Sequence, residues 1–231
     1  MKVNVLGCYG RYAPHNGATS GYLLNSDNGK NIIIDFGAGV LANLQKYISI
    51  DNIDTIILTH LHFDHVSDIG TLKYALGYLG VKGIKLYLPK TPSIMSDLLI
   101  SNDFEVHYLD EQTHFEIDGI KFSFVKTNHP IETYAVRVAY KDKIMAYTSD
   151  CKVQDMAKIT ENANVVIGDA CILDSVWSEN SPHLSVRQLA TNIPKNCKLY
   201  LAHLTSGDEE NILKEAITYH SDSSLVKDFY L

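Results

Sequence analysis

Three histidines and one aspartate lie within six residues of this sequence, in the segment HLHFDH at residues 60–65. The segment directly follows a short β-branched run that is typical of a buried strand. Residues two apart in an extended turn project to the same side, so His60 and His62 are predicted to bind one cation. Asp64 and His65 lie beyond the turn and are predicted to face a second cation.

Four residues cannot complete the coordination of two zinc ions, because each ion takes about four ligands. Three further polar residues each follow an apolar run: His129 in TNHP, Asp150 in YTSD and His203 in LAHL. Strand ends that meet at one edge of a sheet line a cleft. These three side chains are therefore predicted to join the first cluster as metal ligands.

Strand-like runs alternate with helical stretches along the whole chain, which indicates a layered α/β or α+β domain. The predicted strands are residues 3–6, 22–24, 31–35, 55–59, 84–88, 105–108, 165–167 and 198–202, with hairpins between 115 and 147. The predicted helices are residues 40–47, 64–79, 93–101, 185–192 and 208–219. About a dozen strands are more than one small parallel sheet contains. The pattern therefore favours two sheets packed together, with the helices outside.

Length and composition restrict the function classes. The 231 residues, 45% of them apolar, predict a single folded domain over residues 1–231. A net charge of −7 is the wrong sign for a broad nucleic-acid surface. No apolar run reaches the roughly 18 residues of a membrane helix, and no export signal is recognised, which predicts a cytoplasmic protein without a membrane partner. The four cysteines form no CxxC pair, which excludes a zinc ribbon.

The sequence resembles the metallo-β-lactamase superfamily, whose HxHxDH signature residues 60–65 match in full. The DFGAG segment at residues 35–39 resembles the turn that this family carries upstream, and the ribonuclease-Z-like branch is the nearest match. The resemblance implies an α+β fold, the four-layer αββα sandwich. It also implies two sets of zinc ligands that share one aspartate: His60, His62 and His129 for one ion, Asp64, His65 and His203 for the other, and Asp150 for both.

A second pair of residues extends the resemblance. Ribonuclease-Z-like enzymes carry a His-Glu-Ala-Thr segment and then a His-Ser-Thr segment, and this chain has GDAC at residues 168–171 and HLS at 183–185. The resemblance implies that Asp169 and His183 deliver a proton to the leaving oxygen, with Asp169 one methylene shorter than the glutamate of the family. The alternative for His183 is a helix-capping role beside Ser185. The preceding segment, which contains Trp177, is a candidate wall of the substrate pocket.

These observations predict a dinuclear zinc hydrolase that acts on small phosphodiesters or short oligonucleotides through a metal-bridging hydroxide. Two zinc ions would leave a residual charge of about +1 after Asp64, Asp150 and the hydroxide are counted, which suits an anionic diester. No serine or cysteine lies in a nucleophile elbow, and none is required. Manganese or iron in place of zinc stays open, and the resemblance also implies a homodimer.

Three alternative functions stay open. A transfer-RNA 3′-end endonuclease has the same ligands, but its protruding arm is absent from the short segment between His129 and Asp150. A glyoxalase-type thioester hydrolase shares the bridging aspartate but gives no reason for the His183 and Asp169 pair. A non-catalytic metal-bound binding module needs no proton donor.

Overall fold

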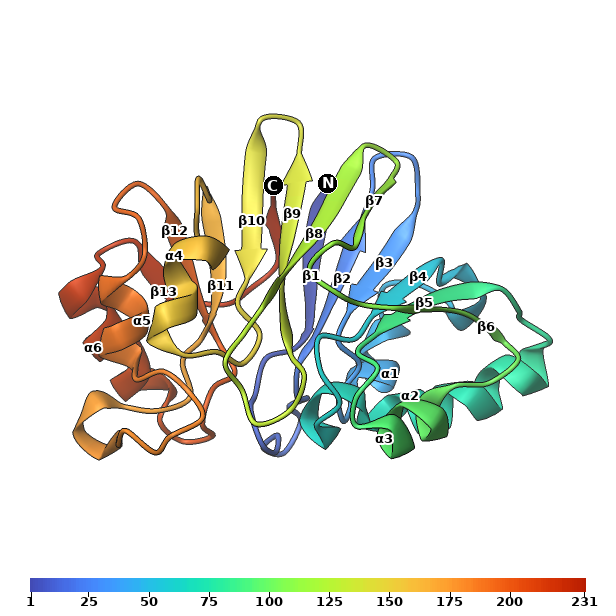
Figure 1. Cartoon of the computed structure of the whole chain (residues 1–231), viewed down its shortest axis with the longest axis horizontal. Coiled ribbons are helices and arrows are strands. Elements are labelled where there is room, and N and C mark those ends of the chain that lie inside the picture. The colour runs from blue at the N-terminus through green and yellow to red at the C-terminus, as the bar shows by residue number, and fades with distance from the viewer.

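The computed structural model describes residues 1–231 and contains two seven-stranded mixed sheets that pack face to face (Figure 1). The first sheet has, in spatial order, β14 (Phe229–Tyr230), β1 (Lys2–Gly7), β2 (Gly21–Asn25), β3 (Asn31–Ile34), β4 (Thr55–Ile57), β5 (Ile84–Leu88) and β6 (Phe104–Tyr108). The second has β13 (Ser223–Leu225), β12 (Lys198–Ala202), β11 (Val165–Asp169), β10 (Lys143–Tyr147), β9 (Tyr134–Tyr140), β8 (Ile120–Lys126) and β7 (His114–Ile117). The strands from β3 to β6 and from β10 to β13 are parallel, and the remaining pairs are antiparallel.

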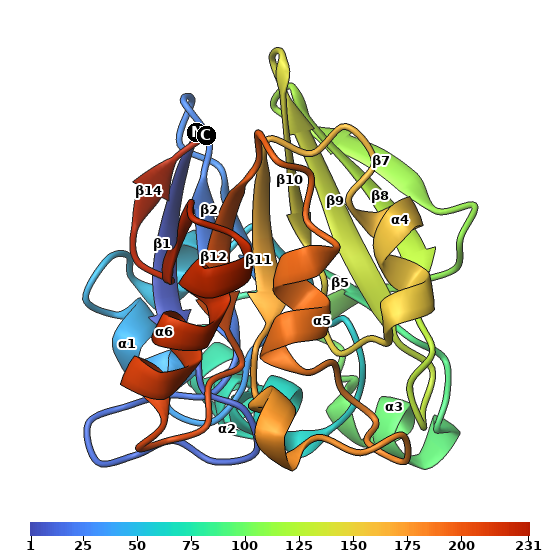
Figure 2. The same cartoon turned by 90° about the vertical axis from the view of Figure 1, so that its left-hand side faces the viewer.

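Helices cover the outer face of each sheet (Figures 1 and 2). The first sheet carries α1 (Val40–Leu44), α2 (Phe63–Leu79) and α3 (Ser93–Leu99), and the second carries α4 (Met156–Ile159), α5 (Val186–Thr191) and α6 (Glu209–Tyr219). Three buried apolar clusters separate the layers, one between the sheets and one under each set of helices. The predicted four-layer αββα sandwich of the metallo-β-lactamase fold is therefore confirmed.

The predicted helix at residues 64–79 begins one residue earlier, at Phe63. It buries Val66, Ile69, Leu72 and Leu76, whose spacing of three or four residues places them on one face. The sequence did not predict α4, β13 or β14. These elements have four, three and two residues, too short for a periodic apolar pattern.

Several strands end at the same edge of the sandwich. β1 and β11, one from each sheet, both run toward the lower edge in Figure 2. β10, β11 and β12 are parallel, and β8 runs in the same direction because it is separated from β10 by the antiparallel β9. The residues after these strands therefore meet at this edge. No helix combines the length and the apolar content needed to cross a membrane.

Candidate metal centre

The seven side chains that were predicted from the sequence to be metal ligands lie together at this edge. The donor atoms of His60, His62, His129 and Asp150 all lie within 4.8 Å of one another. Those of Asp64, His65 and His203 form a second group, whose donor atoms also lie within 4.8 Å of one another. The loops after β4, β8, β10 and β12, together with the first turn of α2, thus bring seven residues from a span of 144 positions into one site.

Asp150 lies between the two groups. Its Oδ2 is 3.4 Å from His60 Nε2 and 3.6 Å from His129 Nε2. Its Oδ1 is 3.5 Å from the Nε2 atoms of both His65 and His203. The two carboxylate oxygens therefore face different sets of imidazoles, which is the arrangement that a carboxylate shared by two cations requires.

Several buried polar atoms of this cluster have no hydrogen-bond partner. They include the Nε2 atoms of His60 and His65 and the Oδ1 of Asp150. Burying such an atom unpaired is costly, and native structures leave few of them. Imidazole nitrogens and carboxylate oxygens are ligands that zinc prefers, so a divalent cation would satisfy the atoms that the protein leaves unpaired. The residues present fit a metal.

Buried hydrogen bonds fix the orientation of the rings. His65 Nδ1 lies 2.7 Å from Oδ2 of Asp35, a fully buried residue that directly follows β3. His60 Nδ1 lies 3.2 Å from the Thr59 hydroxyl and 3.4 Å from the Ser149 hydroxyl. Each of these two rings therefore directs its other nitrogen toward Asp150, because such contacts set the ring orientation of a metal ligand.

Burial and neighbouring charges act in opposite directions on the histidines of the cluster. Burial opposes a charge on His65, but the carboxylates around this residue outweigh burial and raise its pKa to about 10, so a cation would displace a proton there. Burial lowers the pKa of His60 and of His129 to about 4, so both imidazoles are neutral at pH 7, the form that binds metal. Burial opposes the negative charge of Asp150, but the surrounding histidines, His203 first, hold its pKa well below the usual value. Asp150 is therefore an anion in the middle of the site.

The Asp169 carboxylate contacts two histidines at the rim of the cluster. Its Oδ2 is 2.8 Å from His183 Nδ1, and its Oδ1 is 3.3 Å from His203 Nδ1. Burial opposes a charge on His183, but the negative charge of Asp169 outweighs burial and raises the pKa of His183 to about 11. The capping role considered for His183 is wrong, because Ser185 is the N-cap of α5 and its side chain accepts a bond from Gln188 N.

Some residues of the site were not found from the sequence. Cys171 joins Asp169, His183 and His203 in a third group of donor atoms within 4.8 Å. The contact of Asp35 with His65 was also missed, although Asp35 carries the signal that identified the ligands, a polar residue directly after an apolar strand. The contact of Asp169 with His203 has no sequence signal, because Asp169 ends β11, His203 follows β12, and nothing in the sequence shows that these two side chains meet.

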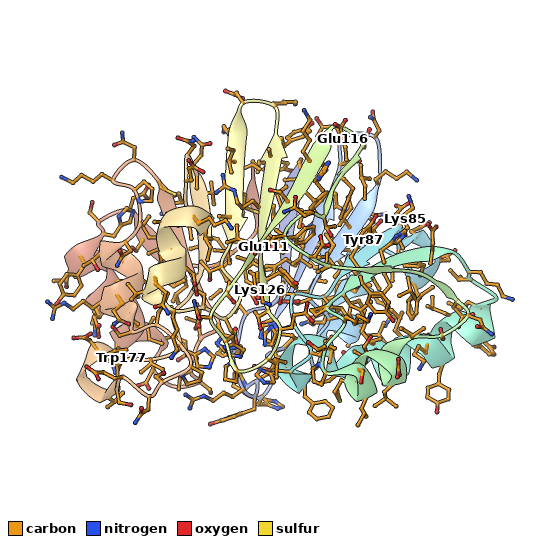
Figure 3. All side chains as sticks on the ribbon, in the orientation of Figure 1. Lys85, Tyr87, Glu111, Glu116, Lys126 and Trp177 are labelled. Atoms are coloured by element: carbon orange, nitrogen blue, oxygen red, sulfur yellow. The ribbon has the colours of Figure 1, made fainter.

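Three cavities border the cluster. One of about 300 Å³ is lined by His129, and one of about 270 Å³ is lined by His183 and Trp177. A third, of about 340 Å³, is lined by Asp64 and by the loop that contains Arg11. Trp177 lies near the lower edge of the molecule in Figure 3, and its indole N–H donates to the backbone carbonyl of His183 at 2.9 Å. The segment therefore lines a cavity beside His183, and its role as a wall of the substrate pocket stays a prediction.

Comparison with known proteins decides the family. The sequence model described as the metallo-beta-lactamase superfamily matches residues 16–152, more than half of the chain. The chain belongs to the metallo-beta-lactamase superfamily. A second model, described as the anti-Pycsar protein Apyc1, matches residues 94–221.

Individual members of the superfamily are similar over different lengths. The probable metallo-hydrolase YhfI of Bacillus subtilis is 29% identical and covers 94% of this chain and 93% of its own. Its crystal structure superposes with a TM-score of 0.89 over 99% of this chain and 97% of that one. Ribonuclease Z of Borreliella burgdorferi is 30% identical over 62% of this chain and 49% of its own. Zn(2+)-bound PqqB of Methylobacterium extorquens, 14% identical, shares the fold, with a TM-score of 0.76 over the full length of both chains.

The fold, the buried cluster and the likeness to YhfI together indicate a metal-dependent hydrolase of this superfamily. The ribonuclease Z relatives are more distant than the nearest match expected from the signature segments, since the Borreliella protein matches only 62% of this chain and human tRNase Z, short form, is 20% identical.

Proposed function

We propose that this protein is a dinuclear zinc-dependent hydrolase that cleaves small phosphodiesters or short oligonucleotides. The ligands would divide into two sets that share Asp150: His60, His62 and His129 on one side, and Asp64, His65 and His203 on the other. Zinc is favoured by the nitrogen-rich donor set and by the zinc in the PqqB structure. Manganese or iron is an alternative that metal analysis distinguishes.

The observation that carries the proposal is the His183 and Asp169 pair beside the cluster. His183 Nδ1 is engaged by Asp169 at 2.8 Å, which leaves Nε2 to donate a proton. Two zinc ions, when bound, would supply positive charge and lower the pKa of a water molecule toward 7. His183 would protonate the departing oxygen, and Asp169 would hold the ring in the tautomer that does so. A purely structural metal site has no use for this pair.

The comparisons support a phosphodiester as the substrate class. The relatives named ribonuclease Z act on RNA by their name, and the likeness to them extends over 62% of this chain in the Borreliella protein. Eight residues line the cavity beside His183, and only two of them, Trp177 and Val153, are hydrophobic. A polar leaving group suits such a cavity better than an apolar one.

Two diesters with different leaving groups test the role of His183. A 4-nitrophenolate leaves without help, whereas the alkoxide leaving group of a dinucleoside monophosphate needs a proton. We expect His183→Ala to lower kcat for the dinucleoside roughly 10²- to 10⁴-fold and to affect bis(4-nitrophenyl) phosphate much less. Zinc content, measured by elemental analysis, is expected to stay near two ions per chain.

His107→Ala is the matched control, because His107 is a half-buried residue of β6 whose ring lies beside Glu105 and Tyr87 and belongs to none of the groups of the metal centre. It should leave both activities unchanged. Equal losses on both diesters in His183→Ala would remove the proton-donor role. A zinc-loaded protein that hydrolyses no diester would overturn the proposed function and favour a thioester substrate or a binding module.

A further inference from the structure

Lys152 lies two residues after Asp150 and lines two of the cavities that border the metal centre. One of these cavities contains His129 and the other contains His183. Gln154 is the only other residue common to both. Lys152 is therefore placed between a residue of the metal cluster and the proposed proton donor.

The Lys152 ammonium has no partner in the protein. The side chain is half-buried, and its Nζ forms neither an ion pair nor a hydrogen bond. Other lysines whose ammonium forms no ion pair or hydrogen bond, such as Lys82, Lys121 and Lys143, are exposed to water. A half-buried ammonium that lacks a partner is disfavoured unless an anion joins it.

The backbone of Lys152 is held firmly next to the site. The Asp155 carboxylate accepts a hydrogen bond from Lys152 N at 3.0 Å. The same carboxylate accepts bonds from Asn128 N at 2.8 Å and from Asn128 Nδ2 at 2.9 Å. Asp155 is 8% exposed, so this connection is largely shielded from water. It ties Lys152 to the segment that carries His129, which immediately follows Asn128.

We propose that Lys152 binds an anionic phosphoryl oxygen of the substrate and thereby determines that the site accepts anionic esters. The inference rests on the proposed function for the place of the substrate, and it deepens that function by naming a residue outside the metal cluster. Lysine suits this role because its ammonium is a compact charge with three donors on a flexible stem.

The surrounding charges favour an anion at this position. Among the residues that line the two cavities, Glu179 is the single carboxylate, and it is exposed and forms no ion pair with Lys152. The whole chain carries a net charge of −7, so a local positive group at the rim of the site would add to the attraction that bound cations exert on an anion. Lys152 is the one cationic side chain in these two cavities apart from the histidines.

Two variants of Lys152 test the inference in the zinc-loaded protein. Lys152→Met keeps the length of the side chain and removes the charge, whereas Lys152→Arg keeps the charge. We expect Lys152→Met to raise KM for bis(4-nitrophenyl) phosphate roughly tenfold, with kcat little changed, because a charged hydrogen bond to the bound anion is lost. Lys152→Arg should restore most of the affinity.

Calorimetry with inorganic phosphate provides a readout that needs no turnover. The affinity for phosphate should fall by a similar factor in Lys152→Met, while zinc content stays unchanged. Lys195→Met is the matched control, because Lys195 is exposed before β12, at the end of that strand opposite His203. It should change neither KM nor phosphate affinity.

Two outcomes would overturn the inference. Phosphate affinity in Lys152→Met could equal that of the wild type, or the hydrolysis of the neutral ester 4-nitrophenyl acetate could fall as much as that of the diester. If the wild type hydrolyses no diester but phosphate binding still depends on Lys152, the proposed function fails and the anion-binding role stands.

Discussion

At the scale of single residues, Asp35 holds one face of the metal centre. Its Oδ2 receives bonds from His65 Nδ1 at 2.7 Å, Thr59 Oγ1 at 3.0 Å and Tyr147 OH at 2.9 Å. Its Oδ1 accepts from Thr59 N at 2.8 Å. All of these groups are buried, so the carboxylate is surrounded by donors without access to water. Replacing one of its oxygens by a donor would leave buried groups unpaired.

We therefore expect Asp35→Asn to destabilise the protein by about 1–3 kcal/mol and to weaken zinc binding roughly 10- to 100-fold. Urea unfolding measures the first effect, and competition with a chromophoric chelator measures the second. Tyr147→Phe removes a single donor and should have a smaller effect on both. Asp97→Asn, at an exposed position of α3, serves as the control. Zinc affinity at the wild-type level in Asp35→Asn would refute the positioning role of Asp35.

The residues of the centre could be predicted from the sequence to an unusual extent, because part of the centre lies in one histidine-rich motif at residues 60–65 and the other ligands follow apolar runs. His60, His129, Asp150 and His203 were found in this way, and the structure brings them together. Asp35 has the same signal, but nothing in the sequence says which histidine it contacts. Lys152 was missed because its significance depends on the absence of a partner, which only packing reveals.

At the scale of elements, the turn after β3 interlocks with the beginning of α2. Phe36 N donates to His65 O at 2.7 Å, and Asp68 N donates to Phe36 O at 3.1 Å. A Cβ at Gly37 would overlap the backbone carbonyl of Asp64 and the Thr19 hydroxyl. The turn can approach α2 this closely only because residue 37 has no side chain.

Gly37→Ala should push this turn away from α2. We expect the free energy of unfolding to fall by about 3 kcal/mol or more, the upper end of the loss of roughly 1–3 kcal/mol that overpacking causes. Gly77→Ala is the matched control within α2, because a Cβ there meets nothing within 4 Å. That variant should be neutral or more stable by roughly 0.5–1 kcal/mol, as alanine favours a helix. Denaturant unfolding measures both, and equal stabilities of the two variants would contradict the interlock.

The elements themselves were predicted where the pattern is long or strongly apolar. The strands at residues 84–88 and 198–202 have the predicted bounds, and α2 differs by one residue. The edge strands β13 and β14 were not predicted, because pairing with a neighbour rather than their own sequence makes them strands. Ser223 and Ser224 have no strand preference, yet they pair in register with Leu199 and Tyr200 of β12.

At the scale of the whole molecule, the metal centre joins the two halves of the sandwich. His60 and His65 come from the part of the chain that forms the first sheet, whereas Asp150 and His203 follow strands of the second. Cations held between them would bind the folded state alone and would stabilise it by mass action.

Removal of metal should therefore lower the melting temperature. At free zinc about 100-fold above its dissociation constant the stabilisation is about 2.7 kcal/mol, which corresponds to about 5–10 °C for a chain of this length. Differential scanning calorimetry of chelated and zinc-loaded protein measures this shift. Asp150→Asn should abolish most of it, because both groups of ligands lose their shared carboxylate. A melting temperature independent of zinc would contradict a cation-bridged sandwich.

The shape and charge of the whole chain set the expected size of the substrate. The segment between His129 and Asp150 consists of the hairpin of β9 and β10 and the short loops on either side of it, and no further element is inserted there (Figure 1). With a net charge of −7, few phosphates of a long RNA can be neutralised.

We expect a dinucleoside monophosphate to be hydrolysed with a KM that changes less than about tenfold between 50 and 200 mM salt, because a short diester makes few ionic contacts. A precursor transfer RNA should not be cleaved at a specific site. Specific cleavage whose affinity falls roughly 10³-fold or more over that salt range would instead indicate six or more phosphate contacts and an extended RNA surface.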